Sequence, residues 1–251
     1  MTLHKEPLVM LHGWGMHGGI WGSAAEQLAK HFRVHCVDLP GYGQNRQKKE
    51  PEKGYSLDSI VAELSRHFNE PVNVCGWSLG GQIALHWAQH HPNQINKLII
   101  VASTPCFVQR PGWPCAIASE VLQEFAQALE QDFQLTLRRF IALQVRGSEK
   151  ERELLQTMRK RITEGGEPDM PALRAGLEIL RNTDLRDELA RITQKTLVIA
   201  GERDTLTPPA ASAFLAQALP HARLAQIHGA AHAPFLSHSD EFVKQVTEFL
   251  N

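Results

Sequence analysis

The sequence is poor in several features that mark particular classes of protein. Its four cysteines show neither CxxC nor metal-ligand spacing, so neither a thiolate metal site nor a disulfide framework is indicated. The formal net charge is −1, which provides no general attraction for nucleic acid or a membrane surface. No hydrophobic run reaches transmembrane length, and residues 1–6 contain no hydrophobic signal region. We therefore expect a soluble, reduced, cytoplasmic protein with Cys36 and Cys75 buried in strands.

Internal repeats and low-complexity segments are also lacking. The chain does have 251 residues and a hydrophobic content of 43 %, which is enough for one sizeable α/β core. Short apolar, β-branched runs alternate with segments of helical periodicity, and this alternation predicts a doubly wound, mostly parallel sheet. The expected strands cover residues 8–11, 34–37, 72–75, 98–102, 196–200 and 223–227, and the expected helices cover residues 20–31, 57–68, 80–91, 209–218 and 239–250.

Residues 107–184 break this alternation, because they contain four helical patterns and no convincing strand. Ser148 and Glu151 have the spacing of a capping box, which predicts that the third of these helices begins there. We expect a core formed by residues 1–106 and 185–251, with residues 107–184 inserted as a helical lid. The alternative is that these helices only add to the scaffold.

Residues 76–80, Gly-Trp-Ser-Leu-Gly, lie between an expected strand and an expected helix. A G-x-S-x-G sequence at such a turn is the nucleophile elbow, in which glycines allow a sharp turn that exposes the serine hydroxyl. The following helix N-terminus favours a developing anion. Ser78 is therefore the candidate nucleophile.

A serine needs a base, and the base needs a carboxylate that holds its tautomer. In this fold the acid and then the histidine follow the serine along the chain. Asp204 follows the expected strand 196–200 and is the preferred acid, with Glu202 as its local competitor. His232 lies among small residues beyond the last strand and is the preferred base, with His228 as the alternative.

An oxyanion hole needs two backbone N–H donors. Leu79, which follows the nucleophile, supplies one, and the loop after the first strand, His12-Gly13-Trp14-Gly15, supplies the second from Trp14. We expect the Trp14 side chain to form a wall of the acyl pocket and His12 to brace the loop by hydrogen bonding. The Gly-x-Gly of residues 41–43 reads as a structural turn, because no phosphate-binding motif surrounds it.

The motifs HGWG, DLPGYG, GWSLGG, GERD and GAAHAPF occur in the order found in the α/β-hydrolase superfamily, which the chain resembles over nearly its whole length. More closely, residues 102–107, 139–144, 176–180 and 232–235 are similar to the esterase family that acts on pimeloyl-[acyl-carrier protein] methyl ester in biotin synthesis. The resemblance implies hydrolysis of that methyl ester, cleavage of short esters, no cofactor or metal, and a monomer that meets acyl carrier protein.

By the same resemblance, Ser78, Asp204 and His232 form the catalytic triad. The resemblance also implies a set of substrate-binding residues, which are Trp14, Ser78, Leu79, Phe140, Ile141, Ala142, Leu143, Gln144 and His232. Only about seven residues precede the first expected strand, so the family's usual antiparallel N-terminal strand is expected to be absent.

The expected lid is basic, since residues 138–161 contain eight Arg or Lys and three Glu. A basic surface would steer an acidic carrier protein, and Arg139 and Arg152 are the preferred docking residues. The alternative is a solvated helix face with i,i+4 pairs. Other functions remain open, namely a generic short-chain carboxylesterase, a carbon–carbon bond hydrolase, or a non-catalytic binding module of the same fold.

Overall fold

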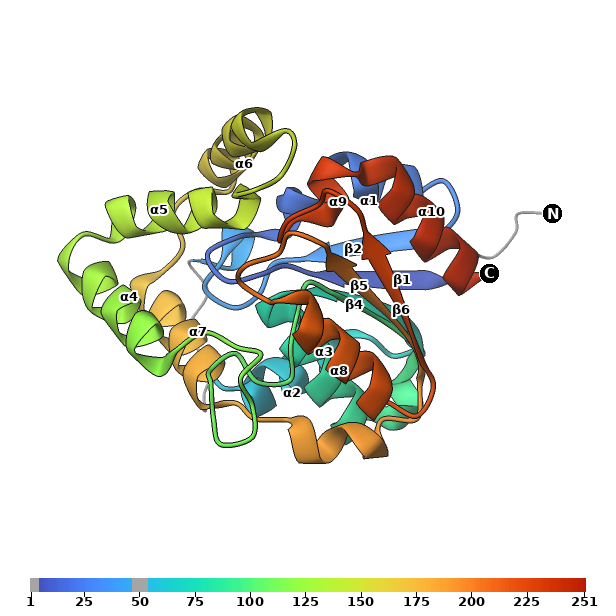
Figure 1. The fold of residues 1–251 in the computed structure, drawn as a ribbon. Helices are drawn as coiled ribbons and strands as arrows, with labels where there is room; N and C mark the ends of the chain where they lie inside the picture. The colour runs from blue at the N-terminus through green and yellow to red at the C-terminus, as the bar shows by residue number, and fades with distance from the viewer. Residues whose placement is uncertain (1–4, 47–53) are drawn as a thin grey trace.

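The structure is a computed structural model that describes residues 5–46 and 54–251. Its centre is a six-stranded sheet in the order β2-β1-β3-β4-β5-β6, in which every neighbouring pair is parallel (Figure 1). The predicted doubly wound α/β fold is thereby confirmed. The strands are β1 (Pro7–Leu11), β2 (Arg33–Val37), β3 (Val72–Trp77), β4 (Ile95–Val101), β5 (Lys195–Gly201) and β6 (Ala222–Ile227).

Helices cover both faces of the sheet, which explains why the central strands are apolar along their whole length. In Figure 1, α1, α9 and α10 lie above the sheet, and α2, α3 and α8 lie below it. The helices of these two layers are α1 (Gly22–Leu28), α2 (Leu57–His67), α3 (Leu79–His90), α8 (Pro209–Ala218), α9 (Pro234–Ser237) and α10 (Ser239–Leu250).

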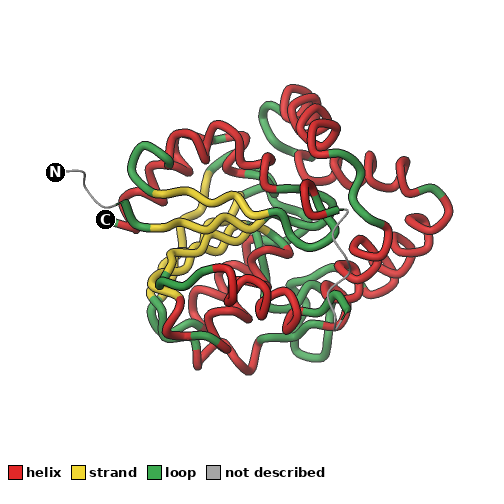
Figure 2. Tube along the Cα trace, turned by 180° about the vertical axis from the view of Figure 1, so that it is seen from behind, coloured by secondary structure: helices red, strands yellow, loops and turns green. Residues whose placement is uncertain are grey.

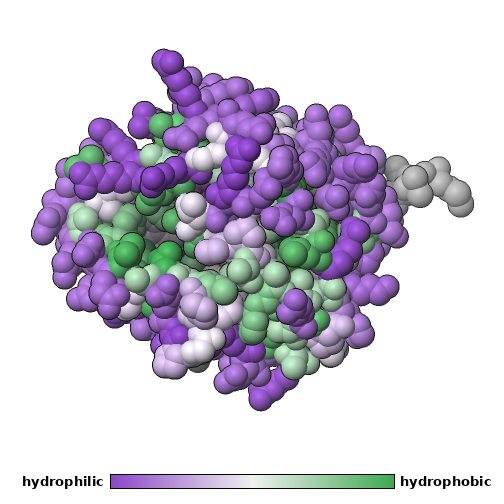
Figure 3. Space-filling model, viewed as in Figure 1, coloured by the Kyte–Doolittle hydropathy of each residue, from purple (hydrophilic) through white to green (hydrophobic). Residues whose placement is uncertain are grey.

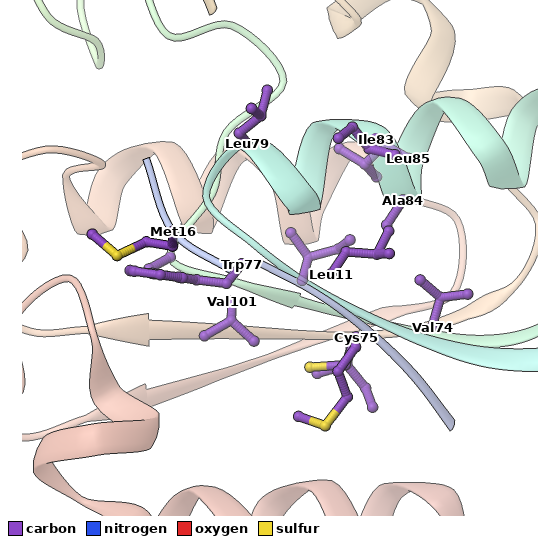
Figure 4. Close-up of a cluster of buried hydrophobic side chains, with 14 of the residues drawn as sticks. Leu11, Met16, Val74, Cys75, Trp77, Leu79, Ile83, Ala84, Leu85 and Val101 are labelled. Carbon is purple, nitrogen blue, oxygen red and sulfur yellow. The ribbon is translucent and has the colours of Figure 1, made fainter. Parts of the chain in front are cut away.

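The core between β3 and α3 shows how the sequence pattern produces this packing. All six residues of β3 are buried, and α3 is buried over ten of its residues. Figure 4 shows Ile83 and Leu85 of α3 on one side of the strands and Cys75 on the other. Burying such aliphatic side chains stabilises the fold by about 1.5–3 kcal/mol each. The helix that begins after Ser78 is therefore held rigidly.

The prediction of a buried Cys36 is wrong. Cys75 lies in the centre of the sheet and is buried, whereas Cys36 is exposed. The reason is topological, because β2 is an edge strand and carries half-buried and exposed residues throughout. The strand signal in residues 34–37 was correct, but a single strand does not reveal its place in the sheet.

Four α-helices and the short 3-10 helix η4 (Arg186–Arg191) separate β4 from β5, and the four α-helices extend beyond the sheet at one end of the molecule (Figures 1 and 2). A loop with two isolated bridges, Val108 with Ile117 and Arg110 with Trp113, leads into them. The four helices are α4 (Ser119–Gln131), α5 (Phe133–Val145), α6 (Glu151–Gly165) and α7 (Met170–Asn182).

The predicted capping box at the start of α6 is not formed. The N-cap residue is Lys150, which makes no side-chain cap, and the Ser148 hydroxyl is buried without a hydrogen-bond partner among the described residues. The Glu151 carboxylate instead accepts a hydrogen bond from the Gly147 N–H. The tight turn at Gly147, with φ of 82°, moves Ser148 out of the capping position.

No helix within the described ranges has the length and apolar character needed to cross a membrane. The expectation that an antiparallel strand is absent before β1 concerns, in part, residues 1–4, which lie outside the described residues.

Candidate active site

Ser78 occupies the turn between β3 and α3 in a strained backbone conformation. Its φ is 55° and its ψ is −118°, a region that non-glycine residues rarely adopt and that costs of order 1–3 kcal/mol. The turn is held by hydrogen bonds from the Ser78 N–H to the Val101 carbonyl and from the Ser103 hydroxyl to the Ser78 carbonyl. This strained geometry is the nucleophile elbow that the pentapeptide predicted.

The backbone around this turn is so closely packed that a side chain has no room at Gly80 and little room at Gly13. A Cβ on Gly80 would lie 2.4 Å from the carbonyl oxygen of Leu11, the last residue of β1. A Cβ on Gly13 would lie 3.2 Å from the Ser78 Cβ. The loop after β1 can therefore approach the serine closely, so both predicted oxyanion-hole segments meet at one place.

The structure brings His232 and Asp204 together. The His232 Nδ1 lies 2.8 Å from the Asp204 Oδ2, and both side chains are almost fully buried. Because a carboxylate only accepts, the Nδ1 carries the hydrogen and the Nε2 keeps its lone pair. That is the tautomer in which the Nε2 can act as a base. No hydrogen bond joins the Ser78 hydroxyl to this ring among the described residues, as is common without substrate.

Asp204 is saturated with donors that orient it. Its Oδ1 accepts from the backbone N–H groups of Leu206 and Thr207, and its Oδ2 accepts from the Thr207 hydroxyl at 2.5 Å as well as from His232. The sequence reasoning missed Thr207. A signal was present in the spacing Asp-x-x-Thr, which is typical of a turn that the aspartate side chain closes on itself.

The competing residues are engaged elsewhere. Glu202 accepts from the Gly229 N–H at 3.1 Å and lies 2.8 Å from the Nδ1 of His228, whose side chain is 83 % exposed. Glu202 and His228 thus form a surface pair, whereas Asp204 and His232 form a buried one. The geometry favours the residues that the sequence analysis preferred.

Two hydrogen bonds to the backbone of His232 position its loop. The Trp77 Nε1 donates to the His232 carbonyl at 2.8 Å, and the His232 N–H donates to the Gln144 carbonyl at 3.1 Å. Trp77 is the neighbour of Ser78 and Gln144 lies in α5. The histidine loop is therefore fixed between the elbow and the inserted helices, a connection that the sequence pattern did not reveal.

The candidate oxyanion loop is braced as expected. The His12 Nε2 accepts from the Leu39 N–H at 3.0 Å, and the Nδ1 donates to the Gly13 carbonyl at 2.8 Å. Burial lowers the pKa of His12 from 6.5 to about 4, against opposing contributions from the Gly13 carbonyl and Asp38. The ring is consequently neutral at neutral pH, so the expectation of a bracing rather than a titrating role is confirmed.

Trp14 connects this loop to three inserted helices. Its Nε1 donates to the Leu173 carbonyl of α7 at 2.8 Å, and its ring makes edge-to-face contacts with Phe125 of α4 and Phe140 of α5, with centroids 5.4 and 4.9 Å away. Trp14 and Ser78 are 1 % and 5 % exposed. Both residues are thus buried, and of the two aromatic partners of Trp14, Phe125 was not among the predicted site residues.

The remaining predicted residues occupy one stretch of α5 and two exposed positions. Ile141 and Gln144 are buried, and the Gln144 Oε1 has no hydrogen-bond partner among the described residues, while Ala142 and Leu143 are half-buried. Arg139 of α5 and Arg152 of α6 are exposed on different helices, and no ion pair within the described ranges involves either of them.

Comparison with known proteins agrees with this architecture. The family model described as the α/β-hydrolase fold matches residues 6–239. Among solved structures, an esterase from Exiguobacterium antarcticum superposes with a TM-score of 0.88 at 25 % identity, covering 97 % of this chain and 91 % of that one. The enol-lactonase from Burkholderia xenovorans LB400 superposes with a TM-score of 0.84 at 24 % identity, covering 98 % and 91 % of the two chains. The second likeness concerns the fold alone.

Curated relatives are more similar in sequence. A protein of Nitrosomonas europaea named pimeloyl-[acyl-carrier protein] methyl ester esterase is 44 % identical over 96 % of this chain and 94 % of its own length. A protein of the same name from Chromobacterium violaceum is 42 % identical over 99 % and 96 % of the two chains. These matches extend over the sheet and the inserted helices alike, and the chain therefore belongs to the α/β-hydrolase family.

Proposed function

We propose that this chain hydrolyses the methyl ester of pimeloyl-[acyl-carrier protein] methyl ester to pimeloyl-[acyl-carrier protein] and methanol, as a monomer in the cytoplasm. The observation that carries the proposal is the 44 % identity to a relative of that name over 96 % of the chain, because this extent includes the helices over the site as well as the core. Residues 107–184 then act as the lid of a core made by residues 1–106 and 185–251.

The chemistry follows from the buried His232–Asp204 pair. The His232 Nε2 takes the proton of the Ser78 hydroxyl while the serine oxygen attacks the ester carbonyl. The tetrahedral intermediate collapses to an acyl-enzyme, and the same imidazolium protonates the departing methoxide to give methanol. Water, deprotonated by His232, then attacks the acyl-enzyme and releases the carboxylate. No cofactor or metal takes part in these steps.

The N–H groups of Trp14 and Leu79 stabilise the negative oxygen of both tetrahedral intermediates. Neither N–H is used in a hydrogen bond to another described residue, and Leu79 begins α3, where the helix N-terminus favours negative charge. Ser78 and Trp14 are both buried, and exclusion of water from the site strengthens these interactions.

The substrate poses a problem of selectivity, because its thioester to the carrier is intrinsically more labile than its methyl ester. Selectivity requires that the acyl chain be threaded so that only its distal end reaches Ser78. We propose that Phe140 to Gln144 line this path, since they run along α5 from the Trp14 ring to the His232 loop. Figure 3 shows hydrophobic side chains gathered at the surface between α4 and α5.

The carrier protein would dock on the basic lid. Arg139 and Arg152 are exposed and unpaired among the described residues, and residues 138–161 carry eight cationic and three anionic side chains. Acyl carrier protein is acidic, so this surface would raise its rate of encounter at low ionic strength.

The proposal is tested by comparing kcat/KM for methyl pimeloyl-carrier protein and for a short p-nitrophenyl ester. We expect the carrier substrate to be strongly preferred, and Arg139→Glu to remove that preference while leaving the short ester unaffected. Arg66→Glu, at an exposed position on α2 away from the lid, is the matched control.

Equal cleavage of both substrates, with no effect of Arg139→Glu, would identify a generic short-chain carboxylesterase. Failure to cleave any ester while a fluorophosphonate probe still labels Ser78 would instead indicate a carbon–carbon bond hydrolase, which uses the same triad. Failure of the probe to label Ser78 as well would indicate a non-catalytic binding module.

A further inference from the structure

A second cluster of chemically capable side chains lies away from Ser78, where α2 packs against α3 (Figure 1). His86 and His90 are one turn apart on α3 and therefore share a face. Asp58 belongs to the first turn of α2. One ring nitrogen of each histidine and one carboxylate oxygen of Asp58 all lie within 4.8 Å of one another.

His86 is positioned by a hydrogen bond to Asp58. Its Nε2 lies 2.7 Å from the Asp58 Oδ1, and since a carboxylate only accepts, the hydrogen on this nitrogen is directed at Asp58. The His86 side chain is nearly buried, with 11 % of its surface exposed. A metal ion would take the place of this hydrogen, because a histidine ligand coordinates through a ring nitrogen that carries no proton.

His90 is oriented by the hydrogen bond that metal-binding histidines usually make. Its Nδ1 lies 2.9 Å from the backbone carbonyl oxygen of His86, and since a carbonyl only accepts, the Nδ1 carries the hydrogen. The lone pair is therefore on the Nε2 of an exposed ring. Such a hydrogen bond to the second ring nitrogen fixes the tautomer and increases the ligand's basicity.

We propose that Asp58, His86 and His90 bind one Zn²⁺. The ligands would be the Nε2 of each histidine and an Asp58 carboxylate oxygen, and a water molecule would complete the four-coordinate shell that zinc prefers. The ion replaces the hydrogen now directed from His86 to Asp58. This hydrogen moves to the His86 Nδ1, which makes no hydrogen bond to another described residue.

The site would be separate from the esterase centre. His86 and His90 are eight and twelve residues beyond Ser78, which places them about 12 and 18 Å farther along α3 at a rise of 1.5 Å per residue. The bound ion would join the N-terminal turn of α2 to the C-terminal turn of α3. Glu188 of η4 (Arg186–Arg191) adds negative charge near His86 and so favours a cation.

The test is a Zn²⁺ titration of tag-free protein against a chromophoric chelator at pH 7.5. We expect one equivalent to bind, and His90→Gln to weaken binding at least about tenfold, since even loss of a residue that only orients a ligand costs 10–100-fold. His31→Gln, at an exposed histidine outside the cluster, should change nothing. Bound Co²⁺ should show d–d absorption that His90→Gln abolishes, and Zn²⁺ should raise Tm only in proteins with an intact cluster.

Because His90 is exposed, His90→Gln should fold and keep its esterase activity, which serves as the check on the variant. Asp58→Asn provides a second variant. If one equivalent of Zn²⁺ binds equally well to wild type, His90→Gln and Asp58→Asn, or if wild type binds none, the proposal is overturned and the cluster is only an Asp58–His86 hydrogen bond.

Discussion

Ser78, the proposed nucleophile, has a backbone conformation that most residues avoid. The strain is imposed by close packing of the elbow, where Gly80 touches β1 and the Ser78 N–H and carbonyl are both bound. The serine is thus held at the start of α3 at a local energetic cost, an arrangement common at active sites.

This cost predicts that two substitutions of Ser78 differ in stability. Ser78→Ala and Ser78→Gly should both reduce kcat by about 10⁴-fold or more, because no acyl-enzyme can form. Ser78→Gly should unfold at a higher denaturant concentration than Ser78→Ala, with a difference of about 1 kcal/mol, because glycine adopts positive φ without a Cβ clash. Urea unfolding of the two variants measures this difference, and equal midpoints would contradict the assignment of strain.

His12 makes stability depend on pH. In the unfolded chain its imidazole binds a proton near pH 6.5, whereas burial lowers the pKa in the folded protein to about 4. Between these two pKa values the unfolded state binds more protons than the folded state. The contribution of neutral His12 to the free energy of unfolding is therefore fully present above pH 6.5 and is lost as the pH falls toward 4. The loss is on the order of 3 kcal/mol.

We expect the free energy of unfolding of His12→Gln to change less between pH 6.5 and 4.5 than that of the wild type. The control His31→Gln, at the surface, should show the wild-type pH dependence. Urea unfolding between pH 4.5 and 7.5 provides the measurement. A wild-type slope that persists in His12→Gln would assign the pH dependence to another group.

At the scale of elements, the inserted helices and the core are connected through Trp14. This side chain follows β1, yet it hydrogen-bonds α7 and packs against aromatic residues of α4 and α5. Gly176 of α7 makes this approach possible, because a Cβ there would lie 2.6 Å from the Trp14 ring. Movement of the helices would therefore displace the loop that carries a proposed oxyanion donor.

Removing one aromatic partner should consequently affect substrate binding as well as stability. Phe125→Ala in α4 removes contacts with both Trp14 and Phe140 and should lower the free energy of unfolding by about 1–3 kcal/mol, since Phe125 is only half-buried. We also expect KM to rise more for long acyl esters than for short ones. Steady-state kinetics over a series of chain lengths tests this.

Phe214→Ala is the matched control, because Phe214 is also half-buried and its aromatic partner is Trp113 rather than Trp14. It should lower stability by a comparable amount and leave the chain-length dependence of KM unchanged. The same change of KM in both variants would mean that general loosening, not the contact with Trp14, is responsible.

At the scale of the whole molecule, charge is distributed unevenly. The chain is nearly neutral, with a formal net charge of −1, although residues 138–161 carry an excess of positive charge. A cluster of positive charges on a nearly neutral protein attracts an anionic partner over a distance of about one Debye length, which is roughly 10 Å at 0.1 M salt. If residues 138–161 are the proposed docking surface, their charge should therefore affect the encounter with a carrier protein rather than the chemical step.

Ionic strength should separate the two substrates. Raising the salt concentration from about 0.05 to 0.5 M should lower kcat/KM for methyl pimeloyl-carrier protein by about tenfold or more and leave that for a short p-nitrophenyl ester unchanged, because screening weakens only the steered association. Arg139→Glu should show a smaller salt effect. Equal salt dependence for both substrates would argue against docking on this surface.

The sequence alone was sufficient for the elements and for the order of the chemical groups. Hydrophobic periodicity and glycine spacing are local properties, so the six strands, the elbow at Ser78 and the acid loop at Asp204 were readable from neighbours along the chain. The preference for Asp204 over Glu202 also came from local sequence, namely the position of each residue after the strand at 196–200.

Tertiary structure decided what depends on residues distant in the chain. Cys36 is exposed because β2 lies at the sheet edge, Ser148 is displaced by the turn at Gly147, and Thr207 completes the pair of Asp204 and His232. The contacts of Trp14 with Phe125, and of Asp58 with His86, join separate helices and loops. Sequence patterns encode which face of an element is buried, but packing in three dimensions determines which neighbour that face meets.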